Sequence, residues 1–252
     1  VDLLLTLAET PTEIEDLFRK HANLVGRPED DEDVLEARKE VQAEILRGIF
    51  NEATSYGWYL DRLAMMPKGV DAEMLSQTTG MPLMDAEALL DELRPLSFIK
   101  VYQPPEEREQ NRQVLPGRVF LHDELYHLLR SDIVPNWRYA EIQIAHALVR
   151  NYYDPHIEAL QRTIEATGDP EARVPLRSRL QKLQVERLYY LLVYDPIKGY
   201  EAYKRLTEYA NWWRWVGFSN RLLDEFLRYY NDPMRRPEFE RRGLDGEQVS
   251  QE

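Results

Sequence analysis

Residues 60–101, LDRLAMMPKGVDAEMLSQTTGMPLMDAEALLDELRPLSFIKV, carry the clearest pattern in the chain. Apolar residues at helical spacing predict three helices: one that ends before Pro67, one that stops at Gly80 and one that begins after Pro82. The stretch then changes to alternating apolar and polar residues at 98–102, a spacing that predicts a β-strand. Three helices followed by a strand make a compact mixed unit.

The residues that follow extend this unit. KGVD at 68–71 is expected to turn the chain between the first two helices. A proline-containing loop follows the strand, and VFLHDELYHLLR at 119–130 predicts a second strand at 119–121 and a further helix from Asp123. This is the order of elements in a winged helix. We therefore predict a winged-helix domain with a two-stranded wing over 51–135.

Helical periodicity dominates the rest of the chain. Residues 1–50 read as helices broken by an acidic loop at 26–33. From 136 to 232 the strand pattern vanishes, and short-linked antiparallel helices are expected at 137–153, 155–167, 171–193, 196–213 and 216–230. The tail, 233–252, is charged and expected to fray. The predicted fold is mainly α: a helical segment, a winged helix and an array of antiparallel helical hairpins with tetratricopeptide-like spacing.

Three Asp-Pro pairs supply the helix starts in the carboxyl-terminal half: Asp154-Pro155, Asp169-Pro170 and Asp195-Pro196. An Asp side chain accepts hydrogen bonds from the free amide groups of a helix start, and Pro suits the first helical position. Each pair is expected to open a new helix.

Composition excludes several classes of protein. With 43% hydrophobic residues among 252, the chain is unlike a disordered one. The absence of cysteine excludes disulfide frameworks and thiolate chemistry. No apolar run approaches the ~20 residues of a membrane-spanning helix, and no signal peptide is recognised. We expect a cytoplasmic protein without a membrane partner.

Catalytic and metal-binding signatures are missing from the sequence. There is no GxxxxGK[ST], GxGxxG, GxSxG or HExxH motif, and the eleven glycines are scattered. His122 and His127, five residues apart, would face different sides of a helix, so no metal site is predicted. We expect no catalytic residues and no enzymatic activity in this chain.

Charge argues against DNA binding by the predicted winged helix. The helix that would enter a major groove, residues 83–96, carries Asp85, Glu87, Asp91 and Glu92 against Arg94 alone. Its net charge of −3 would be repelled by phosphates. In the predicted wing, three arginines (Arg108, Arg112 and Arg118) are balanced by three glutamates (Glu106, Glu107 and Glu109). A protein-contacting or regulatory winged helix is the expectation.

The two quoted stretches resemble the winged-helix domain of STAND-type signalling NTPases, the class that includes the NB-ARC proteins. In that family the domain closes with a strand that runs into a Met-His-Asp motif; here the motif reads Leu121-His122-Asp123. The resemblance covers about 80 residues. It implies that residues 1–50 correspond to the family's helical domain and the later helices to its sensor. The family's P-loop and Walker B modules are absent, so the resemblance implies a carboxyl-side piece of a larger ATPase.

The resemblance gives His122 a role. The family's histidine at this position contacts the β-phosphate of ADP, so ADP or ATP is expected in the parent protein and none in this piece. An imidazole near a helix amino terminus can donate to an anionic oxygen, which is compatible with that role. A capping or packing histidine remains the alternative, and Asp123 is expected to cap the following helix.

The aromatic residues of the carboxyl-terminal half fit helix packing, with one exception. Trp212, Trp213, Arg214 and Trp215 place three indoles within four residues, and a helix cannot point all three the same way. At least one should be exposed or bury against another element, which predicts a partner-binding site.

Together these observations predict a regulatory, partner-binding portion of a STAND-type ATPase. Its expected partners are its own upstream nucleotide-binding domain and a protein or small molecule sensed by the helical array. The alternatives are a winged-helix transcription regulator whose helical half binds an effector or dimerises, and a scaffold whose helical array grips a peptide.

Overall fold

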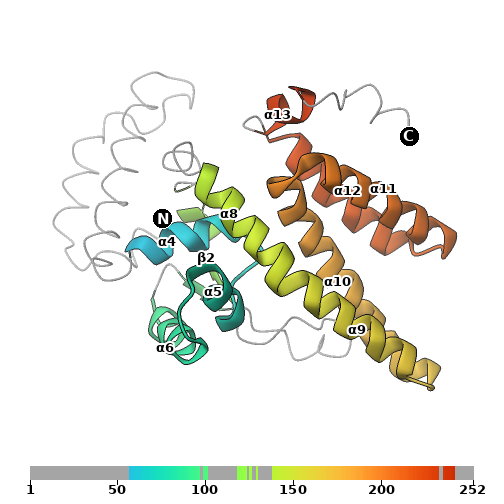
Figure 1. Ribbon diagram of the computed structural model, residues 1–252, viewed down its shortest axis with the longest axis horizontal. Helices are drawn as coiled ribbons and strands as arrows, with labels where there is room; N and C mark the ends of the chain where they lie inside the picture. The colour runs from blue at the N-terminus through green and yellow to red at the C-terminus, as the bar shows by residue number, and fades with distance from the viewer. Residues whose placement is uncertain are drawn as a thin grey trace, which may run out of the picture. The chain divides into compact units, whose positions relative to one another are not determined.

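The structure is a computed structural model that describes residues 57–96, 99–101, 118–123, 125–126, 129, 138–232 and 235–241. It is mainly helical with a small two-stranded antiparallel sheet, which confirms the predicted mainly-α class (Figure 1). None of the described helices offers the uninterrupted apolar length that a bilayer crossing requires. The helices expected within 1–50, the wing loop at 102–117 and the tail beyond residue 241 lie outside the described residues.

The elements in chain order are α4 (Gly57–Met65), α5 (Ala72–Thr79), α6 (Leu83–Leu93), β1 (Ile99–Val101), β2 (Val119–Leu121), α8 (Arg138–Leu148), the π-helix η4 (Val149–Tyr153), α9 (Asp154–Ala166), α10 (Pro170–Tyr194), α11 (Pro196–Trp212), α12 (Val216–Tyr230) and α13 (Arg236–Arg241). By their contacts they form two compact units. One holds α4, β1 and β2; the other holds α5 and α8 to α13; the residues of α6 are divided between them.

In the first unit, β1 and β2 pair antiparallel with Ile99 opposite Leu121. Val70 adds a third partner, because its N–H and C=O both bond to Val119, at 2.9 and 3.0 Å. The KGVD segment predicted as a turn therefore also supplies a strand residue. Gly69 just before it has a φ of +80°, and a Cβ there would lie 2.4 Å from the Phe120 ring, so only glycine fits.

The second unit is built around α10, which packs against α8, α9, α11 and α12 (Figure 1). Two of the predicted Asp-Pro starts are confirmed. The Asp169 carboxylate accepts the N–H of Glu171 at 2.9 Å, and the Asp195 carboxylate accepts the N–H of Lys198 at 3.3 Å. Because these caps leave links of only a few residues, α10 turns back on α9 and α11 turns back on α10.

The remaining pair, Asp154-Pro155, does not start a new helix, so that prediction was wrong. Asp154 has helical angles, φ −59° and ψ −50°, and α9 continues from the π-helix without a break. Pro155 lacks the N–H of a normal helical turn, and a π-turn of wider hydrogen-bond spacing precedes it. The π-helix buries Tyr152 and Tyr153. Their hydroxyl groups donate to Asp71 at 2.7 Å and to Glu186 at 3.2 Å.

Part of the segment predicted to fray is folded, because residues 236–241 form α13, which packs on α12. Phe239 of α13 is 0% exposed among the rings of α11 and α12. Arg235, also buried, donates to the Glu141 carboxylate of α8 and pairs with Asp232 at 3.1 Å. Because this segment is rich in charged residues, its sequence did not indicate that Phe239 and the Arg235–Glu141 ion pair would be buried.

Candidate binding groove

A groove of about 680 Å³ opens in the second unit between α9 and α11, with α10 as its floor. Each helix contributes one line of side chains at spacings of three or four, and in the lines from α9 and α10 a glutamine stands between two apolar residues. The lines are Ile157, Gln161 and Ile164 from α9; Leu180, Gln184 and Leu188 from α10; and Ala202, Leu206 and Tyr209 from α11. Spacings of three and four keep each line on one helix face.

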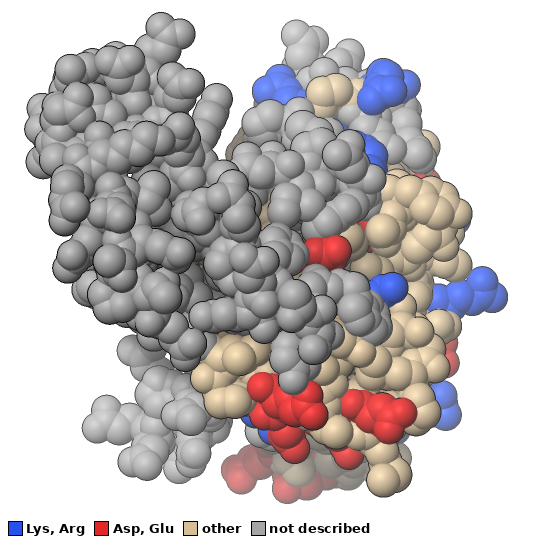
Figure 2. Space-filling view, turned by 90° about the vertical axis from the view of Figure 1, so that its left-hand side faces the viewer, with Lys and Arg blue, Asp and Glu red and all other residues tan. Residues whose placement is uncertain are grey.

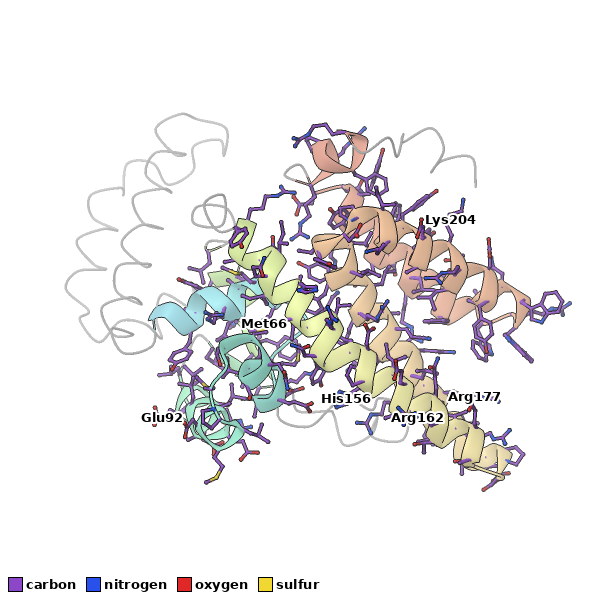
Figure 3. The ribbon with its side chains drawn as sticks, in the orientation of Figure 1. Met66, Glu92, His156, Arg162, Arg177 and Lys204 are labelled. Carbon is purple, nitrogen blue, oxygen red and sulfur yellow. The ribbon has the colours of Figure 1, made fainter. Side chains whose placement is uncertain are left out.

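Only some of the charged side chains that line the groove form ion pairs with each other. Asp154 and Arg187, at one end, form an ion pair with 2.5 Å between Oδ1 and Nε. Arg177 of α10 (labelled in Figure 3) and Arg205 of α11 also line the groove, and within the described ranges neither has a hydrogen-bond or ion-pair partner. Glu165 on the α9 side likewise has none among these residues. Two guanidinium groups are thus available to a ligand.

Amide groups sit in the middle of the groove. Gln181 accepts a hydrogen bond at 3.1 Å from Arg221 of α12. Partial burial lowers the pKa of this Arg221 guanidinium. Gln161 and Gln184 make no hydrogen bond with the described part of the chain, although both line the groove. Each amide can both donate and accept a hydrogen bond, so the groove offers polar contacts on its α9 wall and on its α10 floor.

Of the four residues predicted as a partner site, Trp212 ends α11, and Trp213, Arg214 and Trp215 form the turn to α12. Trp212 is 82% exposed and Trp213 54%, while Trp215 is partly buried and lines the groove beside Tyr209, with ring centroids 5.5 Å apart. The expectation that at least one indole is exposed is confirmed. The turn thus joins an exposed aromatic surface to one end of the groove.

Arg214 explains how this turn is made. Its φ of 57° is left-handed, the N–H of Trp215 bonds to the C=O of Ala210, and the N–H of Arg214 bonds to the C=O of Asn211. These bonds form a Schellman motif, whose left-handed position is usually glycine. An arginine there carries backbone strain of about 1–2 kcal/mol. Strain of this kind concentrates at functional sites.

His122, the predicted nucleotide contact, belongs to the first unit and not to the unit with the tryptophans. It is partly buried at the point where β2 gives way to a helix, and its C=O accepts the N–H of Tyr126 at 2.8 Å. The adjacent Asp123 pairs with Lys100 Nζ at 2.7 Å. The side chain of His127 lies outside the described residues, and no three potential metal ligands gather among those that are described.

Neither a family model, nor a curated protein, nor a solved structure matches this chain. Sequence reasoning found Trp215 but missed the groove, whose lining runs from Asp154 to Trp215 over three helices. The available signal was the glutamine within two otherwise apolar lines, Gln161 and Gln184. Amides at core-facing positions mark a surface that is not fully closed by the chain itself.

Proposed function

We propose that this chain is the regulatory, partner-binding portion of a STAND-type signalling ATPase and has no catalytic activity of its own. The observation that carries the proposal is the groove, an open concave surface with unpartnered polar groups and an aromatic turn at one end. Concave surfaces of this kind, lined by apolar side chains and a few placed polar groups, are where ligands bind.

The winged-helix part of the proposal is supported by the order of elements. The bridge between Val70 and Val119 places a strand residue between the first two helices and pairs it with the second wing strand. Helix, strand, helix, helix, strand, strand is the winged-helix order. We extend this to a winged-helix domain over 51–135 and a helical-hairpin array over 136–232.

In the parent protein, His122 would contact ADP and hold the winged helix in the closed state. Its partial exposure at the end of β2 is compatible with this role. A ligand that prefers the open state would then shift the population when it binds the helical array. The signal enters through the groove and the output is nucleotide exchange in the upstream domain.

Transcriptional regulation through DNA binding fits the charges less well. All four acidic residues predicted to oppose DNA on α6 are exposed, namely Asp85, Glu87, Asp91 and Glu92. Figure 2 shows acidic side chains gathered toward the bottom of the displayed face. Arg118 of the predicted wing is 1% exposed and donates to the C=O of Lys68, so its guanidinium is buried and not presented to a DNA backbone. Random duplex DNA at low salt should give no saturable gel shift.

The proposal is tested first in the gene. The reading frame before the codon for Val1 should encode a GxxxxGK[ST] motif, and its absence would end the STAND assignment. In the parent protein, His122→Gln should lower ADP affinity about tenfold, since a charge-assisted hydrogen bond is lost. His146→Gln, in the other unit, should leave ADP affinity unchanged. Equal affinity of both variants would contradict the role of His122.

A further inference from the structure

We infer that the groove binds an extended, acidic peptide segment, with an apolar side chain of that segment seated against Tyr209 and Trp215. This inference rests on the proposed function, because it names the class of ligand that the helical array would sense. Three features of the groove carry it: its unpartnered cations, its free amides and its aromatic end.

The cations select the charge of the ligand. Once the Asp154–Arg187 pair is set aside, the lining keeps two arginines, Arg177 and Arg205, and two glutamates, Glu158 and Glu165. Glu158 has Arg162 of α9 3.6 Å away, so Glu165 is the one lining glutamate without a partner among the described residues. The whole chain carries a net charge of −13, which repels acidic ligands in general. An acidic segment therefore binds where arginines remain unpaired, and planar guanidinium groups match carboxylates in bidentate geometry.

The amides select the backbone conformation of the ligand. An α-helix satisfies its own N–H and C=O groups, whereas an extended peptide leaves them free. Gln161 on α9 and Gln184 on α10 present amides that can bond to such a backbone. The α9 wall runs from Asp154 to Glu165, about 16 Å at 1.5 Å per residue, which is the length of about five extended residues.

The aromatic end gives the ligand an anchor. Tyr209 is half exposed, Trp215 is partly buried, and Trp213 stacks on Trp215 with centroids 6.1 Å apart. Rigid rings at the end of a groove form the kind of pocket that dominates binding energy when an apolar side chain fills it. The ligand we expect therefore combines carboxylates with one large apolar residue.

The experiment is a selection of random seven-residue peptides displayed on phage against the full 252-residue chain. Enriched peptides should contain Asp or Glu together with a large apolar residue. Synthetic versions should bind about tenfold more weakly to Arg177→Gln and to Arg205→Gln, because one charge-assisted contact is lost in each. Arg228→Gln, an exposed arginine of α12 outside the groove, is the matched control and should bind normally.

Two further measurements sharpen the outcome. Affinity should fall as salt is raised, and a lactam-bridged helical form of the selected peptide should bind about tenfold more weakly than the linear form. Selected peptides that require Trp215 but lack acidic residues, or bind both groove variants normally, would overturn the acidic inference and leave the proposed function standing. No enrichment, or binding insensitive to Trp215→Ala, would overturn both the groove site and its sensing role.

Discussion

Helices α11 and α12 carry aromatic residues at both ends of the hairpin they form, but the rings are buried at one end and exposed at the other. At one end, Tyr200 and Phe226 pack around Phe239 of α13, with ring centroids 5.9 and 5.8 Å away. At the other end, Trp212 and Trp213 are exposed. Both ends are rich in aromatic residues, with Tyr and Phe at the closed end and Trp at the open end. What differs is whether a later segment of the chain covers the rings.

The contrast separates a structural aromatic cluster from a candidate contact surface. The closed end owes its burial to α13, which is held by Phe239 and by the buried Arg235–Glu141 pair. The open end, within the described residues, is bordered by the groove instead of a covering helix. Aromatic enrichment alone predicts neither outcome, and the apolar residue that closes one end lies in a segment that reads as charged.

Removal of the anchor at the closed end should have the largest effect on stability. Phe239→Ala leaves a cavity among the rings of α11 and α12 and should lower the free energy of unfolding by about 3–5 kcal/mol. Urea unfolding followed by far-UV circular dichroism measures it. A loss below about 1 kcal/mol would mean that α13 does not cover this end in solution.

Loss of the buried Arg235–Glu141 ion pair should have the second-largest effect on stability. Glu141→Gln removes the negative partner of Arg235 and should cost about 2–3 kcal/mol, the guanidinium retaining Asp232 as its second partner. Glu201→Gln, an exposed position on α11, is the control and should change stability by less than about 0.5 kcal/mol. Equal losses of stability in the two variants would contradict the claim that the Arg235–Glu141 pair holds α13 in place.

A change at the open end should act in the opposite direction. Arg214→Gly relieves the left-handed strain and should raise stability by about 1 kcal/mol, or about 2–4 °C in Tm. The matched control is Gly80→Ala in α5, where φ is +78° and a new Cβ meets no atom within 4 Å. That change should lower stability by a similar amount through strain alone. A destabilised Arg214→Gly would show that the arginine side chain contributes contacts that outweigh its backbone strain.

The smallest effect on stability is expected at the most exposed indole. Trp212→Ser should alter the free energy of unfolding by less than about 0.5 kcal/mol, since 82% of the side chain is already in solvent. Thermal unfolding by differential scanning calorimetry checks this. A loss comparable to that of Phe239→Ala would mean that the two ends do not differ as described.

The helices were predictable where local chemistry decides them. Asp169 and Asp195 cap helices because a carboxylate and a following proline suit a helix start where no earlier helix runs into them. The same dipeptide at Asp154 failed because a helix already reached it through the π-helix. Val70 was missed as a strand residue because one residue gives no alternation, and its partner Val119 lies 49 positions away.

The candidate site was predictable only at its aromatic end. WWRW is a local signal, since three indoles in four residues cannot share one helix face. Arg177 and Arg205 gave no such signal, because unpaired and paired arginines look alike in a sequence. The lines through Gln161 and Gln184 resemble ordinary core stripes until the packing of α9 and α11 on α10 leaves a space between them.

The most direct test of a partner-binding groove in the helical half is the set of indole N–H resonances of the five tryptophans, assigned with single Trp→Phe variants. On titration with a selected acidic peptide, the resonance of Trp215 should shift and saturate. Shifts confined to tryptophans other than Trp215 would show that the peptide binds elsewhere, and would contradict the account.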